Sequence, residues 1–277
     1  MRLTSVPVHV LGRCCKAIAY IFARLSSFFY GLLPVLMPPE QLSTHVAHAY
    51  NEIYAAHHLS DVDGIHDSSL DSWELSVLDK YKIDAGRMLV LGAGLGREAL
   101  AIARRGVTVM GMDISYKASQ VAQRRARTAG MPAQFHQASL FELPYKPCSF
   151  DYAIYTSSMY SSIPGKAARQ SWLQNLRQPL KGGALIILSF ASGYPPPSKG
   201  KMLRLWMNDI LRKLPGANRA YQPGDSCLAG HFMHEFQTED ELRTELTEAG
   251  AVIQELCWTA NYTVVTFPAP PVSLSSA

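Results

Sequence analysis

Residues 86–113, GRMLVLGAGLGREALAIARRGVTVMGMD, contain the pattern that decides the expected fold. The apolar run at 88–91 is typical of a strand buried on both faces. A glycine-rich turn follows, and then a helical run from Arg97 that Gly106 ends in the position of a helix C-cap. The β-branched residues after Gly106 predict a second strand ending at Asp113. Together these elements form a β-α-β unit.

The turn of this unit predicts a site for a nucleoside-containing ligand. Glycines between a strand and a helix let a ligand lie against the backbone, because no Cβ atoms stand in the way. The start of the helix adds free N–H groups at the same place. Asp113, at the carboxyl end of the second strand, is placed to accept hydrogen bonds from both ribose hydroxyls.

The glycine spacing separates two classes of cofactor. A dinucleotide-binding fold of the G-x-G-x-x-G type requires a glycine at position 97, where this chain has Arg97. The glycines stand at 92, 94 and 96, and this spacing resembles the first cofactor motif of class I S-adenosylmethionine-dependent methyltransferases. Two later stretches, FDYAIY at 150–155 and LKGG at 180–183, are similar to the family's fourth strand and to its turn into the fifth.

The resemblance implies an α/β fold, a doubly wound seven-stranded sheet that is mostly parallel and has an antiparallel last strand. It implies S-adenosyl-L-methionine as the cofactor and methyl transfer as the reaction. The cofactor-binding residues that it predicts in this chain are Gly92, Ala93, Gly94, Gly96, Asp113, Ile114, Ser139, Leu140 and Tyr155. No metal site is predicted, because no cysteine or carboxylate cluster joins His45 and His48.

Two positions depart from the family's pattern. The family usually has an acidic residue two positions before the first glycine, and this chain has Val90 there. The family commonly has another acidic residue where the adenine is read, and this chain has Ser139, whose hydroxyl is a weaker acceptor. These departures leave a second function open, that of a catalytically inactive cofactor-binding scaffold or sensor at a membrane.

The methyl acceptor is expected at the carboxyl ends of the strands, where open α/β sheets bind their ligands. Tyr160, in the loop after the fourth strand, is either a polar wall of this site or a residue packed on the cap. His231 and His234 precede a helix capped by Thr238, at a junction that often faces the acceptor in the family. An imidazole there is either a base for the acceptor or a structural, hydrogen-bonded group. We predict Tyr160, His231 and His234 as catalytic residues acting on a small or lipophilic acceptor.

Residues 1–38 form an apolar segment with basic residues near its start. Its apolar side chains between Ile18 and Leu33 recur at helical spacing and form one stripe, with Arg24 on the opposite side. A secretory signal is disfavoured, because export separates the protein from a cytosolic cofactor. A membrane span would bury Arg24 at a cost of ~2.5–3.5 kcal/mol. A helix packed on the domain remains an alternative, and we prefer an amphipathic helix lying in a membrane interface.

The rest of the chain divides by composition and by resemblance. Residues 39–83 are expected to form a helical lid, and residues 84–267 the methyltransferase domain, with a substrate-covering insertion at 191–237. The insertion contains a basic amphipathic helix that either packs or makes a second membrane contact. Residues 268–277 are expected to be a disordered tail. Five cysteines without C-x-x-C spacing indicate reduced thiols in the cytoplasm, and a net charge of +4 gives no argument for nucleic acid.

Overall fold

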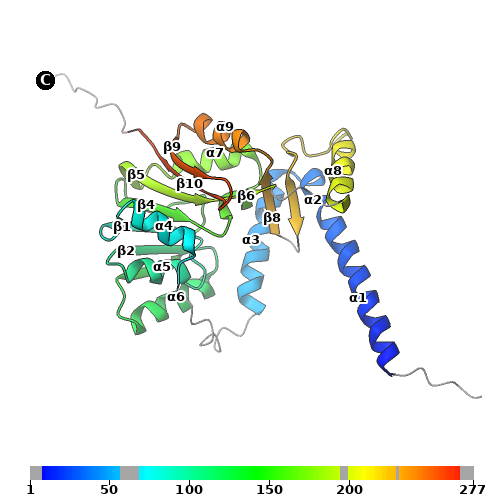
Figure 1. Ribbon diagram of the computed structural model, residues 1–277, viewed down its shortest axis with the longest axis horizontal. Coiled ribbons are helices and arrows are strands. Elements are labelled where there is room, and N and C mark those ends of the chain that lie inside the picture. The colour runs from blue at the N-terminus through cyan, green and yellow to red at the C-terminus, as the bar shows by residue number, and fades with distance from the viewer. Residues whose placement is uncertain (1–7, 57–68, 194–198, 229–230, 269–277) are drawn as a thin grey trace, which may run out of the picture.

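The computed structural model describes residues 8–56, 69–193, 199–228 and 231–268 of the chain (Figure 1). Its centre is a seven-stranded sheet with the strand order β3-β2-β1-β4-β5-β10-β9. The strands are β1 (Arg87–Leu91), β2 (Thr108–Asp113), β3 (Ala133–Gln137), β4 (Phe150–Tyr155), β5 (Leu180–Ser189), β9 (Val252–Cys257) and β10 (Tyr262–Thr266). The order reverses between β1 and β4, which is where doubly wound sheets bind ligands.

The strand directions confirm the predicted fold class. Strands β1 to β5 pair in parallel, whereas β10 runs antiparallel to both β5 and β9. The sheet is therefore mostly parallel, and its last strand in the chain is antiparallel. The predicted β-α-β unit at residues 86–113 forms its two central strands, β1 and β2, and the intervening helix α5 (Arg97–Ala103).

Both faces of the sheet are covered, which explains the unbroken apolar run of β1. Leu89 and Leu91 point into one core cluster, together with residues of α7 (Lys166–Asn175) and α9 (Glu239–Glu248). Met88 and Val90 point into a second cluster on the other face. That second cluster contains residues of α4 (Ser72–Lys80), α5 and α6 (Tyr116–Thr128). A strand with covered faces needs apolar residues at every position.

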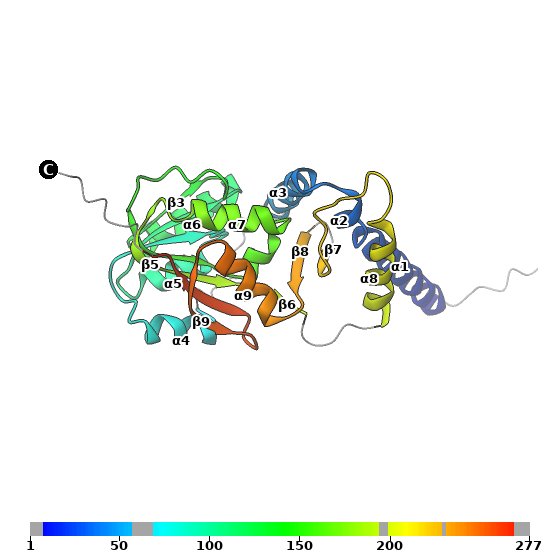
Figure 2. The same cartoon turned by 90° about the horizontal axis from the view of Figure 1, so that it is seen from above.

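Two segments far apart in the sequence form one cap at an end of the sheet. The first contains α1 (Val8–Tyr30), α2 (Leu33–Leu36) and α3 (Pro39–Ala56), and the second contains α8 (Lys199–Leu211), β7 (Asp225–Leu228) and β8 (His231–Phe236). Figure 2 shows them grouped beside the sheet, with the short strand β6 (Ala191–Ser192) joining β8. The cap has its own small core, made by Leu42, Val46, Cys227 and Phe232.

The segments 1–38 and 39–83, which the sequence suggested as separate units, each have only one part in the cap. Tyr30, Leu33 and Met37 pack on the cap core, so only the earlier turns of α1 project from the body of the protein. Helix α3 covers the ligand-binding end of the sheet, whereas α4 packs in the core of the sheet domain. Residues 57–68 of the expected lid and most of the tail predicted at 268–277 lie outside the described residues.

Helix α1 leaves its apolar stripe uncovered. Ile21, Phe22, Leu25 and Phe29 are all exposed, and the helix points away from the sheet (Figure 1). By length and composition alone, the segment Cys15–Leu36 is sufficient to cross a membrane, a property that it shares with signal sequences and some core helices.

Candidate functional site

The glycine-rich turn joins β1 to α5 at the carboxyl edge of the sheet. Gly92 has a φ of +61°, and Gly96 has a φ of +88°. A side chain at position 92 would place its Cβ 3.2 Å from the Tyr155 ring, so this position needs glycine for space as well as for its backbone angle. The turn is held to the next strand, because the Ala93 N–H donates to the Met112 carbonyl at 2.8 Å.

Asp113, the last residue of β2, has its carboxylate fixed beside this turn. Oδ2 accepts a hydrogen bond from the Gly94 N–H at 2.8 Å, and Oδ1 accepts one from the Ser115 N–H at 2.8 Å. Burial raises the pKa of Asp113, while these two N–H groups oppose the rise. A carboxylate has about four acceptor positions, so each oxygen is still able to accept from a ligand hydroxyl.

A cavity of about 530 Å³ opens in front of Asp113, a size typical of small-molecule sites. Six of the nine predicted cofactor residues line it, namely Gly92, Asp113, Ile114, Ser139, Leu140 and Tyr155. The other three, Ala93, Gly94 and Gly96, complete the turn at its edge. The structure therefore brings the predicted cofactor residues together, although they come from four separate stretches of the chain.

Tyr155 marks a place for a polar ligand atom. This side chain is fully buried at the end of β4 and lines the cavity. Its hydroxyl makes no hydrogen bond of good geometry among the described residues, and the Ser162 side chain is the polar neighbour that lowers the pKa of Tyr155 against the effect of burial. An unpaired buried hydroxyl is costly, so the site gains when a ligand supplies an acceptor or donor there. Burial raises the pKa of Tyr155, which keeps the phenol neutral.

Comparisons with known proteins agree with this geometry. A family profile for the methyltransferase domain matches residues 88–183, from β1 to the start of β5. This match and the seven-stranded fold identify residues 88–183 as a methyltransferase domain of the class I S-adenosylmethionine-dependent type. The chain is 35% identical over 105 residues to a ubiquinone biosynthesis O-methyltransferase of Paracidovorax citrulli. The aligned region covers 37% of this chain and 42% of that protein.

A second curated protein resembles this chain in sequence, and a solved structure resembles it in fold. A demethylmenaquinone methyltransferase of Thermus thermophilus is 29% identical over 131 residues, covering 47% of this chain and 56% of that protein. The chain thus spans about half the length of the curated relatives it matches. A 1,6-didemethyltoxoflavin-N1-methyltransferase of Burkholderia thailandensis, solved with its substrate and S-adenosylhomocysteine, shares the fold. The superposition of the two structures has a TM-score of 0.58 at 15% sequence identity. It covers 84% of this chain and 92% of the Burkholderia protein.

The residues of this site fit S-adenosylmethionine, the cofactor of the methyltransferase family that the domain matches. Asp113 supplies acceptors for ribose hydroxyls, and the turn at Gly92 provides a surface without side chains. The hydroxyl of Tyr155 supplies an unused polar partner. Val90 and Ser139 remain departures from the family's pattern. Val90 is buried in an apolar cluster, and Ser139 Oγ accepts a hydrogen bond from the Phe141 N–H.

Arg97 occupies the position where a dinucleotide-binding fold has its third glycine, and in this structure it holds α4 against α5. The guanidinium makes a two-pronged contact with Glu74 at 3.0 and 3.1 Å and donates to Glu98 at 2.6 Å. Glu98 also accepts from the Thr156 hydroxyl at 2.6 Å, just beyond the end of β4. A buried carboxylate thus lies at the ligand-binding edge, from a position that the sequence analysis did not select.

Helix α3 contributes a wall of the cavity. Ser43, Thr44, Val46, Ala47 and Tyr50 line it from this helix. The Tyr50 hydroxyl donates to Met159 Sδ at 3.3 Å, which links the cap to the loop after β4. The sequence predicted a helix here that covers the cofactor, but helical periodicity does not identify which residues face a ligand rather than the core.

Tyr160 does not lie in the cavity wall that the sequence analysis predicted for the acceptor. The residue is fully buried and is absent from the cavity lining. Its hydroxyl donates to Glu245 at 2.8 Å, and the same carboxylate receives Arg169 through two nitrogens at 2.8 Å each. The loop after β4 turns inward at this point, in the short 3-10 helix Met159–Ser162, so its aromatic ring packs in the core.

The two predicted histidines also lie outside the cavity lining. His234 is fully buried, with Nδ1 2.7 Å from Asp225 and Nε2 3.4 Å from Glu241. This arrangement matches the structural alternative for that histidine. His231 packs against the ring of Tyr50, a cavity residue, at a centroid distance of 4.8 Å. Both residues belong to β8, a strand of a β7–β8 hairpin that the sequence analysis did not foresee.

The position of His234 between the carboxylates of Asp225 and Glu241 predicts a folding stability that depends on pH. Burial lowers the pKa of His234, but the carboxylates of Asp225 and Glu241 outweigh burial and the nearby Arg169 and raise it overall. The stabilisation is therefore complete below the unfolded pKa of about 6.5 and is lost as pH rises through the higher folded pKa. We expect His234→Gln to lower the free energy of unfolding, and the loss to shrink as pH increases. Urea unfolding of the variant and the wild type at several pH values measures this loss. A loss that does not vary with pH would contradict a protonated His234 between the two carboxylates.

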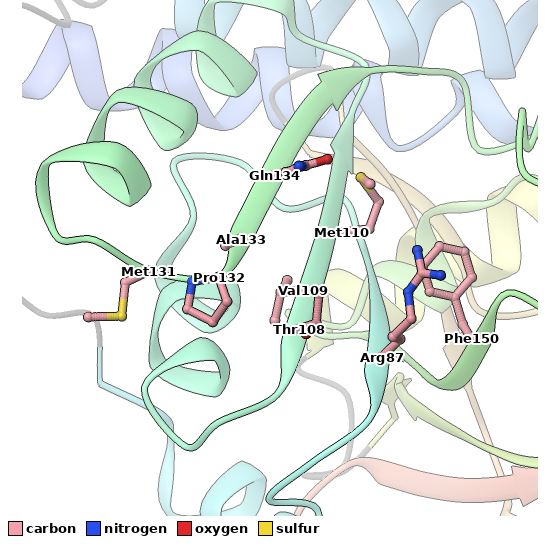
Figure 3. A pocket seen from close by; sticks show the side chains of 9 residues that line it. All are labelled: Arg87, Thr108, Val109, Met110, Met131, Pro132, Ala133, Gln134 and Phe150. Atoms are coloured by element: carbon pink, nitrogen blue, oxygen red, sulfur yellow. The ribbon is translucent and has the colours of Figure 1, made fainter.

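A second hollow, of about 390 Å³, lies at the opposite ends of the central strands (Figure 3). Arg87, Thr108 and Ala133, each the first residue of its strand, contribute to its lining. Arg87 is the charged residue among those that line it, and its guanidinium lies 5.4 Å from the centre of the Phe150 ring. The hollow is remote from Asp113, so we assign the cofactor to the cavity at the carboxyl edge.

Proposed function

We propose that the protein transfers a methyl group from S-adenosylmethionine to a small or lipophilic acceptor. The observation that carries the proposal is the meeting of the Asp113 carboxylate and the unpaired Tyr155 hydroxyl in one cavity beside the glycine-rich turn. A nucleoside with a charged amino-acid end has hydroxyl and carboxylate groups for such partners. The family assignment supports the same cofactor.

The protein's part in this reaction is to bind, to align and to exclude water. The bound cofactor supplies an electrophilic methyl group on its sulfonium. Asp113 holds the ribose, and the turn at Gly92 lets the cofactor lie against the backbone. Helix α3 and Tyr50 close the cavity from the cap side. Holding donor and acceptor in line accelerates transfer without a covalent intermediate on the protein.

The acceptor is proposed to be lipophilic because of the cavity wall and because of the relatives. Apolar residues predominate in the lining, among them Val46, Met112, Leu140, Phe141 and Ile163. Two relatives have names that refer to quinones, which are lipophilic molecules. Tyr160 and His234 are outside the cavity lining, and each is held by a buried carboxylate. We therefore propose an acceptor that is activated without these residues, with His231 as the predicted catalytic residue nearest to the cavity wall.

The alternative is a cofactor-binding scaffold or sensor without catalysis. It is motivated by Val90 and Ser139, which stand where the family usually has carboxylates. The two functions share the binding of S-adenosylmethionine and differ in product formation.

The proposal includes a place in the cell. The exposed apolar stripe of α1 and its basic residues suit a helix lying in the interface of a membrane. A protein anchored in this way would work at the cytoplasmic face, where the cofactor is made, as a peripheral rather than a spanning protein. A lipophilic acceptor dissolved in that membrane would be within its reach.

Cofactor choice is tested by isothermal calorimetry with the full chain. We expect a clear binding heat with S-adenosylhomocysteine and none with NAD, because Arg97 and its Glu74 contact fill the position where the dinucleotide motif needs a glycine. Adenosine serves as the control for the shared nucleoside. Tight binding of NAD with no response to S-adenosylhomocysteine would overturn the proposal.

A further inference from the structure

Helix α8 turns its apolar side away from the rest of the protein. Its side chains Met202, Leu203, Trp206 and Ile210, with Leu214 just beyond the helix, are exposed, and Trp206 has 62% of its surface accessible. The opposite side carries Asn208, which is fully buried. Surface helices normally place their apolar stripe on the core. In the part of the chain that the structure describes, nothing covers this face.

This orientation is fixed by hydrogen bonds to the junction of α1 and α2. Asn208 Nδ2 donates to the Gly31 carbonyl at 3.2 Å. Asn218 donates to the carbonyls of Pro34 and Val35 at 2.8 and 2.7 Å. A Cβ at position 31 would collide with Cδ of Arg204, so the glycine permits α8 to approach this closely. The outward position of Trp206 is therefore set by the packing of the polar side of α8.

Helices α1 and α8 bring two uncovered apolar surfaces to the same end of the molecule. Figures 1 and 2 both show α8 beside α2 and the end of α1, away from the seven-stranded sheet. On α1, Phe22 has 67% of its surface accessible, and Ile21, Leu25 and Phe29 are exposed as well. These helices are far apart in the sequence, so the surface exists only in the folded protein.

The charge of the protein is concentrated in the same two segments. Residues 1–39 contain four Lys or Arg and no acidic residue, and residues 199–220 contain six Lys or Arg and the single acid Asp209. Their combined net charge is +9, whereas the whole chain has +4, so the remainder has −5. Positive charge around exposed apolar residues is typical of segments that bind anionic membranes.

We infer that α8, together with α1, forms one docking surface for an anionic lipid bilayer, with Trp206 inserted at the boundary between headgroups and acyl chains. This extends the proposed membrane contact of α1 to a second helix. Tryptophan favours that boundary, because its ring is apolar and its N–H seeks a polar partner. A second copy of the chain is a poorer occupant, since it would bring a like-charged surface against this one.

The test uses the full chain and vesicles of phosphatidylcholine, alone or mixed with phosphatidylglycerol. We expect flotation with the mixed vesicles and much weaker flotation with phosphatidylcholine. Trp206→Glu is expected to reduce binding to mixed vesicles by about tenfold, through lost apolar burial and added negative charge. Leu75→Glu, at an exposed leucine of α4 on the sheet domain, is the matched control and is expected to bind like the wild type.

A spectroscopic arm locates the contact. Lipids brominated in their acyl chains should quench the tryptophan emission of the wild type. In Trp206→Phe the quenching should be lost while binding is kept. Binding of the wild type that Trp206→Glu leaves unchanged would overturn the role of α8 and leave that of α1. No binding to either vesicle by the wild type would overturn both. A dimer that Trp206→Glu dissociates, without vesicle binding, would assign the surface to a second copy instead.

Discussion

Replacing Asp113 with alanine is expected to weaken S-adenosylhomocysteine binding by ~1.5–3 kcal/mol, roughly ten- to a hundredfold, the scale for hydrogen bonds to a charged group. The carboxylate is buried, and it is oriented by the N–H groups of Gly94 and Ser115 before any ligand arrives. Its removal therefore costs both the ribose contact and a support of the glycine turn. Calorimetry on the purified variant measures the change.

A matched control separates this effect from the loss of any carboxylate. Asp79 lies on the exposed side of α4 and pairs with Arg105, so Asp79→Ala is expected to leave cofactor affinity unchanged. Asp113→Asn keeps the shape of the side chain and one acceptor oxygen, and should lie between the alanine variant and the wild type. Equal affinity of wild type and Asp113→Ala, with both proteins folded, would mean that the ribose is held elsewhere.

Replacing Arg169 with methionine is expected to cost ~3–5 kcal/mol of folding stability, because it leaves the buried Glu245 carboxylate without its partner. Both side chains are buried, Arg169 on α7 and Glu245 on α9, and Tyr160 donates to the same carboxylate. The ion pair therefore joins two helices to the loop after β4. Urea unfolding followed by circular dichroism measures the loss.

Two further variants test the cause. The double variant Arg169→Met/Glu245→Leu removes both charges and should recover more than half of the lost stability. Arg243→Ala breaks an exposed pair with Glu239 on α9 and should change stability by less than about 1 kcal/mol. If Arg169→Met alone is as stable as the wild type, the buried network has no energetic role.

The sheet and the cofactor edge could be predicted from the sequence because their signals are local. The glycines, Asp113 and the apolar run at 88–91 lie within 28 consecutive residues, and backbone geometry forces them together. The helix after Asp113 also begins on a local signal, because Ser115 caps it by accepting a hydrogen bond from the Ala118 N–H. Ser139 and Leu140 were placed in the site by resemblance and do line the cavity.

The acceptor side was harder, because its residues are placed by contacts between distant segments. Tyr160 turns inward to a carboxylate 85 positions away, and His234 is bound by Asp225 of the neighbouring strand β7. A sequence window contains neither partner for Tyr160, so a polar side chain near a strand end looks available. The cap depends likewise on residues 30–46 meeting residues 227–232, a pairing that no periodicity reveals. The outward apolar side of α8 is visible only once Asn208 is seen to face inward.

Methyl transfer itself is tested most directly by supplying the purified full chain with methyl-labelled S-adenosylmethionine and a lipid or metabolite extract. The proposed function predicts that label enters a compound of the extract, most strongly in the organic-soluble fraction. It also predicts that Asp113→Ala, assayed in parallel at the same concentration, transfers far less. Binding of S-adenosylhomocysteine without label in any fraction would contradict the enzyme and favour the scaffold.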